Sequence, residues 1–309
     1  MSRTIAASVV SFIKLGRIKF VGGSLVMYSL GLSVALSEGV ALNLPLTAMG
    51  LLFIILSQLM THYCNDYFDY EADCANTTPT SWSGGSRILP SGQVNIETAF
   101  KASVVLGILA VVQGVYLFVS FNQSYIFVGM AAAILLLSWF YSAPPLRLHS
   151  TGFGELAAAL VVGVLWPVLG YYLQTQTFST TILLAVVPVF LLQFLMLIAI
   201  EFPDEAGDRL TNKKTFLVRF SAPVTARIYA LLLLLHFLLL PVLVLLGLPA
   251  AVAWAMLLLL PLGLWQMLAM WRQQWQQAHN WNRIAFRSVF LFAATGLAEA
   301  LAFLYLSMN

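Results

Sequence analysis

Residues 231–246 read LLLLLHFLLLPVLVLL, an apolar stretch with a single polar residue, His236. A stretch that is apolar on every side of a helix has no face for water, so it is typical of a segment that crosses a lipid bilayer. A membrane β-barrel strand would instead alternate apolar and polar residues. The stretch therefore predicts a membrane-spanning helix, and the same test can be applied to the rest of the chain.

Eight further stretches have this character. At 1.5 Å per residue, about 20 mainly apolar residues are needed to cross a hydrocarbon core of about 30 Å. The nine predicted spans are 20–37, 45–64, 99–120, 124–142, 154–174, 180–200, 226–246, 250–271 and 286–306. Of the 309 residues, 61% are apolar and only 9% are charged, which excludes a soluble globule and a disordered chain. We predict an all-α integral membrane protein with nine transmembrane helices around a central cavity.

The charges fall on one side of this predicted topology. If the N-terminus is cytoplasmic, all 15 Lys and Arg residues lie in the cytoplasmic segments 1–19, 65–98, 143–153, 201–225 and 272–285 or in the adjoining helix ends. Cytoplasmic loops carry an excess of Lys and Arg, so the pattern predicts a cytoplasmic N-terminus and an external C-terminus. The net charge of +3 is too small and too scattered to indicate a nucleic-acid partner.

Acidic residues cluster at the cytoplasmic ends of the second and sixth predicted spans. Residues 65–73 read NDYFDYEAD and residues 201–208 read EFPDEAGD. In each segment the aspartates are spaced so that they share one face of a helix. They are Asp66, Asp69 and Asp73 in the first cluster and Asp204 and Asp208 in the second. The matching positions predict one domain, 1–309, built from two equivalent halves, roughly 1–150 and 151–309.

Like charges on one helix face repel, so something must neutralise the two clusters. Mg²⁺ is typically held by a few carboxylates together with substrate phosphates. We therefore predict a site in which Mg²⁺ bridges the aspartates to a diphosphate. A solvated acidic cap with salt bridges to nearby basic residues is the alternative, and two clusters in matching positions disfavour it.

Several basic residues lie where a diphosphate would need them. Arginine binds phosphate through two parallel hydrogen bonds, while lysine acts as a point charge. Arg87 in the glycine-rich turn 84–87 and Lys213 after the second acidic cluster are expected to contact the diphosphate. Arg17 at the start of the first span and Arg147 after the fourth are further candidates.

Four motifs, in order along the chain, resemble those of the UbiA superfamily of intramembrane prenyltransferases. Residues 65–73 match the family's NDxxDxxxD motif letter for letter, and residues 204–208 match its second DxxxD motif. Residues 83–92 are similar to the family's loop after the first motif, and residues 141–155 to its segment after the fourth helix. The match covers essentially the whole chain, and nine helices is also the family's number.

The resemblance implies two Mg²⁺ ions holding a prenyl diphosphate at the cytoplasmic mouth of the cavity, with its tail in an apolar tunnel open to lipid. It also implies a location in the cell membrane of a bacterium or archaeon. It assigns five aspartates to the metal ions and diphosphate, namely Asp66, Asp69, Asp73, Asp204 and Asp208. It assigns three further residues to the substrates, namely Asn65, Tyr141 and Ser142.

The reaction that the resemblance implies is Mg²⁺-dependent transfer of a prenyl group from its diphosphate to an aromatic acceptor in quinone biosynthesis, through an allylic cation. Acceptors similar to 1,4-dihydroxy-2-naphthoate or 4-hydroxybenzoate are expected, and residues 201–203 favour the menaquinone-type branch. Cyclisation of the prenyl chain and transfer to a non-quinone acceptor are alternatives. A cation-coupled transporter is expected to place acids at mid-span, which this sequence does not favour. Nothing indicates an obligate protein partner.

Three polar residues near the motifs need separate interpretation. His62 lies one turn before Asp66, and we expect it to form a hydrogen bond between helices rather than to bind metal. Glu155 is expected to cap the start of the fifth span. His149 shows no metal-ligand spacing.

Overall fold

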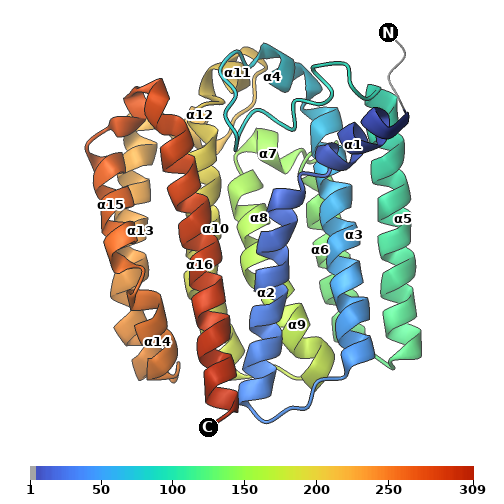
Figure 1. Cartoon of the computed structure of the whole chain (residues 1–309), viewed down its shortest axis with the longest axis vertical. Coiled ribbons are helices and arrows are strands. Elements are labelled where there is room, and N and C mark those ends of the chain that lie inside the picture. Colours follow the sequence, from blue (N-terminus) through green and yellow to red (C-terminus); the bar gives the residue numbers. More distant parts are fainter. Residues whose placement is uncertain (1–4) are drawn as a thin grey trace.

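The computed structural model describes residues 5–309, and all regular structure in that range is helical. Long helices run side by side from one end of the molecule to the other (Figure 1). They are α2 (Ile18–Ser37), α3 (Leu44–Phe68), α5 (Ile96–Ser120), α6 (Tyr125–Phe140), α10 (Thr180–Glu201), α13 (Ala222–Leu245) and α16 (Trp281–Ser307). Two further rods are composite. The first consists of α8 (Gly154–Leu160), a π-helical turn (Val161–Leu165) and α9 (Trp166–Thr175). The second consists of α14 (Ala250–Leu257) and α15 (Leu260–Trp271).

Short helices gather at the end of the bundle opposite the C-terminus (Figure 1). They are α1 (Ile5–Leu15), α4 (Tyr70–Ala75), α7 (Leu148–Thr151), α11 (Glu205–Leu210) and α12 (Phe216–Phe220). Two 3₁₀ turns, Gln274–Gln276 and Ala278–Asn280, join α15 to α16. This end carries both acidic clusters, so the predicted site lies where the long helices give way to short ones.

The helical membrane architecture is confirmed. Within residues 5–309, seven helical segments are long and apolar enough to cross a membrane, and α14 with α15, bent by 52°, makes up to eight. The remaining predicted span, 124–142, corresponds to α6, which has 16 residues and falls short of that length. Each of the nine predicted ranges nevertheless coincides with one of these helical rods.

Polar caps fix where several long helices begin. The side chains of Asn43, Asn95, Ser124 and Ser179 each accept a hydrogen bond from a backbone N–H in the first turn of the helix that follows. Such caps satisfy amide groups that have no partner within the helix. The apolar stretches therefore begin as helices at defined residues.

The close approach of α2 and α9 depends on glycine. A Cβ atom added at Gly31 would lie 1.9 Å from the carbonyl oxygen of Pro167, and one at Gly170 would lie 2.5 Å from the carbonyl oxygen of Tyr28. Small residues let helix backbones approach closely in a membrane, where lipid gives helices no hydrophobic reason to associate. These contacts hold together two of the helices that enclose the central cavity.

We expect Gly31→Ala to destabilise the protein by about 2 kcal/mol, because the added methyl group must push the α9 backbone away. The measurement is thermal unfolding in detergent. Gly129→Ala in α6 is the matched control, since a Cβ there meets no atom within 4 Å. A Gly31→Ala protein that melts at the wild-type temperature would contradict this packing.

Candidate active site

The first acidic cluster lies at the junction of α3 and α4. α3 ends at Phe68, and Asp69 caps it with φ −93° and ψ 3°. The predicted single helix is therefore divided at Asp69 into α3 and the short helix α4 (Tyr70–Ala75). The backbone hydrogen bonds from Asp69 N to Asn65 O and from Asp73 N to Asp69 O, both 2.8 Å, keep the helical spacing across the break.

The second cluster repeats this arrangement at the end of α10. Asp204 precedes α11 as its N-cap residue, and Asp208 lies within α11. The hydrogen bond from Asp208 N to Asp204 O, 2.9 Å, places the two on one helical face, as predicted. α4 and α11 contact each other (Figure 1). The two clusters, more than 130 residues apart in sequence, therefore meet in space.

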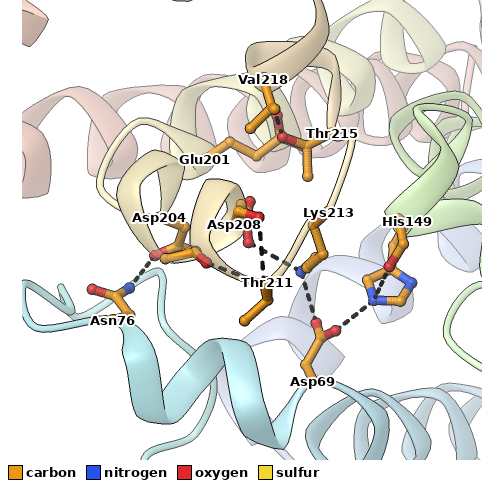
Figure 2. Close-up of polar contacts among 12 residues, drawn as sticks. Asp69, Asn76, His149, Glu201, Asp204, Asp208, Thr211, Lys213, Thr215 and Val218 are labelled. Atoms are coloured by element: carbon orange, nitrogen blue, oxygen red, sulfur yellow. Dashed lines mark hydrogen bonds and ion pairs between the residues drawn. The ribbon is translucent and has the colours of Figure 1, made fainter.

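Lys213 joins the clusters directly. Its Nζ lies 3.1 Å from Asp69 Oδ2 and 3.3 Å from Asp208 Oδ1 (Figure 2). Burial alone would raise the pKa of Asp69, but Lys213 and His149 hold that pKa well below its usual range. Burial lowers the pKa of Lys213, and the two carboxylates more than reverse that effect. One ammonium group thus binds an aspartate from each half of the chain.

Asp204 is tied to the first half of the chain by two further contacts. Asn76 Nδ2 donates to Asp204 Oδ1 at 2.6 Å (Figure 2). Gly84 N donates to Asp204 Oδ2 at 3.1 Å. Burial and the neighbouring Asp208 raise the pKa of Asp204 to about 6. The predicted glycine-rich turn therefore contacts the second acidic cluster through its backbone.

Arg17 holds the other end of the first cluster. Its guanidinium forms an ion pair with Asp66 and donates to Asn65 Oδ1 at 3.1 Å. Ser86 Oγ also donates to Asp66. Because these groups surround it, Asp66 is only 1% exposed.

Asn65 and Tyr141 connect the acidic cluster to the fourth predicted span. Asn65 Nδ2 donates to Asp69 Oδ2 at 2.8 Å and to Ser142 Oγ at 3.1 Å. His149 contacts both Asp69 and the backbone oxygen of Tyr141, and its ring stacks on the Tyr141 ring with centroids 5.5 Å apart. The predicted residues Asn65, Ser142 and Tyr141 thus belong to the same network as the aspartates.

Two adjoining cavities open beside this network. The smaller one, about 100 Å³, is polar, and six carboxyl groups line it together with Arg17 and Lys213. These carboxyl groups belong to Asp69, Asp73, Glu155, Glu201, Asp204 and Asp208. The larger one, about 220 Å³, is mainly apolar and extends between α2, α3, α10 and α16. Arg17, Asn65 and Tyr141 line both cavities, so the acidic site opens onto an apolar chamber.

Arg87 and Arg147 do not line either cavity. Arg87 bonds to the backbone oxygen of Asp73 in the last turn of α4, where the helix carbonyls attract a cation. Arg147 is exposed, in the left-handed turn before α7 with φ 43°. Asp66 and Ser142 are also outside both linings, because protein groups already surround them.

Three polar residues of this region have functions that the sequence did not indicate. Glu155 accepts a hydrogen bond from Phe216 N at 2.7 Å, so it caps α12 rather than the start of its own helix. Glu201 accepts from Leu217 N at 3.4 Å, and Asn76 binds Asp204. His62 forms a hydrogen bond as expected, but to the turn between α1 and α2 rather than to a helix, since its Nδ1 lies 2.6 Å from Gly16 O.

The donor set fits Mg²⁺ that is shared with a diphosphate. Within residues 5–309, no three acidic, His or Cys side chains lie close enough together to hold a metal ion unaided. Mg²⁺ usually takes only one or two carboxylates and completes its shell with phosphate oxygens and water. Burial raises the pKa of Asp73 to about 8, against the opposing effect of Arg17. Six carboxyl groups but only two Lys or Arg side chains line the polar cavity, so it is short of positive charge.

The two aspartate motifs face each other above an apolar chamber, as the resemblance to the intramembrane prenyltransferases leads us to expect. The chain belongs to the UbiA prenyltransferase family, whose model matches residues 24–305. It is 22% identical over 161 residues, 52% of this chain and 50% of the relative, to the 1,4-dihydroxy-2-naphthoate octaprenyltransferase of Bacillus subtilis (strain 168). It is 28% identical over 109 residues, 35% of this chain and 36% of the relative, to the 2-carboxy-1,4-naphthoquinone phytyltransferase of Synechocystis sp.. The matched stretches span half or less of these curated relatives.

Solved structures share the fold over nearly the whole chain. A UbiA homologue from Archaeoglobus fulgidus bound to GPP and Mg²⁺ superposes with a TM-score of 0.64 at 16% identity, covering 96% of this chain and 99% of that one. The apo structure of a UbiA homologue from Aeropyrum pernix K1 gives a TM-score of 0.63 at 15% identity, covering 89% and 97%. The helical arrangement predicted from the family resemblance is therefore confirmed.

We expect Lys213→Met to lower stability by about 3 kcal/mol, because it leaves Asp69 and Asp208 buried without their shared counter-charge. Adding Mg²⁺ should recover part of the loss, since a divalent cation can take the place of the ammonium. The measurement is thermal unfolding in detergent with EDTA and with Mg²⁺. Lys214→Met, at the exposed neighbouring position, is the control and should behave as wild type. Equal melting of the two variants would contradict the bridging role.

Proposed function

We propose that this protein transfers a prenyl group from a prenyl diphosphate to an aromatic acceptor of the dihydroxynaphthoate kind, in a Mg²⁺-dependent step of quinone biosynthesis. The observation that carries the proposal is the convergence of Asp69 and Asp208 on Lys213 at the mouth of an apolar chamber. The two curated relatives have names that specify naphthoate or naphthoquinone acceptors, which supports this acceptor class.

The diphosphate would lie in the polar cavity. Four aspartates line that cavity and would hold two Mg²⁺ ions, namely Asp69, Asp73, Asp204 and Asp208. When bound, Mg²⁺ neutralises the charge that develops on the leaving diphosphate. Lys213 and Arg17 supply further positive charge beside it. Asp66, predicted as another ligand, is already paired with Arg17, and we propose that it positions that guanidinium.

The allylic group would lie where the polar and apolar cavities meet. Tyr141 lines both, and its ring can stabilise a cation through its π face. The reaction breaks the C–O bond to diphosphate and forms a bond from the allylic carbon to a ring carbon of the acceptor. The ring proton then passes to a carboxylate of the polar cavity. The apolar chamber excludes water, which would otherwise capture the cation.

We propose nine membrane crossings, with α6 as the shortest, and a cytoplasmic N-terminus. The one-sided distribution of Lys and Arg supports this topology and, with it, a site at the cytoplasmic face. We further propose that the membrane is the cell membrane of a bacterium or archaeon, as the family resemblance implies. Two equivalent halves, roughly 1–150 and 151–309, are supported by a repeated arrangement. In each half a long helix ends at an acidic motif and is followed by a six-residue helix, α4 or α11.

We expect Asp69→Asn and Asp204→Asn each to reduce prenyl transfer at least 100-fold, because each removes a carboxylate from the Mg²⁺–diphosphate site. The assay combines purified protein, Mg²⁺, radiolabelled prenyl diphosphates of several lengths and a panel of hydroxylated aromatic acids. It measures prenylated product and released pyrophosphate.

Glu71→Gln and Glu205→Gln are the matched controls for that assay. Glu71 is exposed, and Glu205 forms an ion pair with Arg209 at 2.9 Å, so neither lines the polar cavity. Both variants should retain wild-type transfer. Near-normal turnover in Asp69→Asn or Asp204→Asn would refute the proposed mechanism, and a prenyl product formed without any acceptor would indicate a cyclase.

The topology predicts selective labelling of the native cysteines. Cys74 is exposed beside the first acidic cluster, while Cys64 is buried. A membrane-impermeant maleimide should label Cys74 in inside-out vesicles and not in intact cells. In a Cys74→Ser background, Asn122→Cys, in the loop between α5 and α6 at the opposite end, should give the reverse pattern. Labelling of Cys74 from outside intact cells would overturn the orientation.

A further inference from the structure

The apolar cavity contains polar groups that a hydrocarbon chain cannot satisfy. Gln193 of α10 and Trp166 of α9 both line it, and they are 4% and 2% exposed. Gln193 Oε1 and Trp166 Nε1 have no hydrogen-bond partner among the described residues. An unpaired buried polar group costs about 1–3 kcal/mol, so such groups usually have a partner.

Two other polar side chains of this cavity, Gln58 and His62, are already paired within the protein. Gln58 accepts from Ser24 Oγ and donates to Phe20 O at 3.1 Å. His62 bonds to Gly16 O at 2.6 Å. These groups need nothing from a ligand. Gln193 and Trp166 therefore differ from Gln58 and His62 in having hydrogen-bonding capacity left for a molecule inside the cavity. Arg17 also has an unpaired atom, Nε, but its guanidinium is already bound to Asp66 and Asn65.

The local backbone presents both residues at one wall. A Cβ added at Gly163 would lie 2.7 Å from Phe190 Cα, so the two helical rods touch there. Trp166 follows Gly163 by three residues and Gln193 follows Phe190 by three. Because the rods are antiparallel, the Cα atoms of Trp166 and Gln193 lie about 9 Å apart along the bundle axis, on either side of the Gly163–Phe190 contact.

A π-helical turn immediately precedes Trp166. It spans Val161–Leu165, and Val161 and Val162 line the cavity beside Trp166. Such turns are rare, occur inside α-helices and are frequent at functional sites. This irregularity lies in the wall of the cavity, next to the unpaired indole N–H.

Resting on the function proposed above, we infer that the acceptor ring occupies this cavity and bridges Trp166 and Gln193. One oxygen substituent of the acceptor accepts a hydrogen bond from Trp166 Nε1, and a second bonds to the Gln193 amide, which offers both an acceptor and donors. Gln193 lies about 12 Å below Glu201, the last residue of α10. Leu197 and Ile200 lie between them and line both cavities, so the ring would lie directly below the junction where the allylic group is proposed to lie. The two residues thus select an aromatic acceptor with oxygen substituents at two positions.

The test uses Gln193→Leu and Trp166→Phe, which remove one hydrogen-bonding group each and keep an apolar side chain. Each variant should raise the KM for 1,4-dihydroxy-2-naphthoate roughly tenfold and change the KM for the prenyl diphosphate less than about twofold. Wild type should prefer this acceptor over 1-hydroxy-2-naphthoate, which lacks the 4-hydroxyl group. One of the two substituted residues bonds to that hydroxyl, and its variant should no longer distinguish the two acceptors.

Gln113→Leu is the matched control, because Gln113 lies on α5 away from the cavity and bonds to Met49 O. It should leave both KM values unchanged. Size-exclusion profiles check that each variant is folded. If only one of Gln193→Leu and Trp166→Phe folds, that variant alone tests the inference. A rise in the prenyl diphosphate KM instead, or unchanged acceptor KM in a folded variant, would overturn the inference. If wild type forms no prenylated acceptor with any donor, the proposed function itself fails.

Discussion

The ammonium group of Lys213, held between Asp69 and Asp208, is the interaction on which the rest of the site depends. Asp69 directly follows the long helix α3, and Asp208 lies in the short helix α11 that follows α10. Neither would tolerate burial beside other carboxylates without a counter-charge. One cation shared by both brings α4 against α11 and closes the end of the bundle above the apolar chamber. The same position suits a divalent cation, which carries more charge and can also bind phosphate oxygens.

Carboxyl groups outnumber Lys and Arg side chains in the polar cavity, which makes their ionised forms costly. Burial and neighbouring carboxylates raise the pKa of Asp73 to about 8 and that of Asp204 to about 6. These groups are therefore poorly compensated by protein charges alone. A site built to be completed by Mg²⁺ and diphosphate is expected to have this deficit, since the incoming ions relieve the repulsion only when both are present.

The sequence predicted the helical rods and the convergence of the acidic motifs because both leave local signals. Apolar length marks a span, and matching aspartate spacings mark two related helix ends. It could not predict His149 or Asn76, whose partners Asp69 and Asp204 are 80 and 128 residues away. Arg87 and Arg147 line neither cavity, and their contact with a diphosphate stays a prediction. Cytoplasmic loops are basic whatever their function, so position alone does not identify a phosphate ligand. Gln193 was missed because α10 is apolar all round, and such a helix gives no periodicity that distinguishes a cavity face from a packed one.

The most direct test is a structure of the protein with Mn²⁺ and an unreactive prenyl thiodiphosphate, in which anomalous scattering locates the metal. The account predicts metal between the two acidic motifs, with a carboxylate oxygen of Asp69 or Asp73 and one of Asp204 or Asp208 each about 2.1 Å from a metal ion that also binds the diphosphate. Metal ligated by only one motif, or a diphosphate bound without metal, would contradict it.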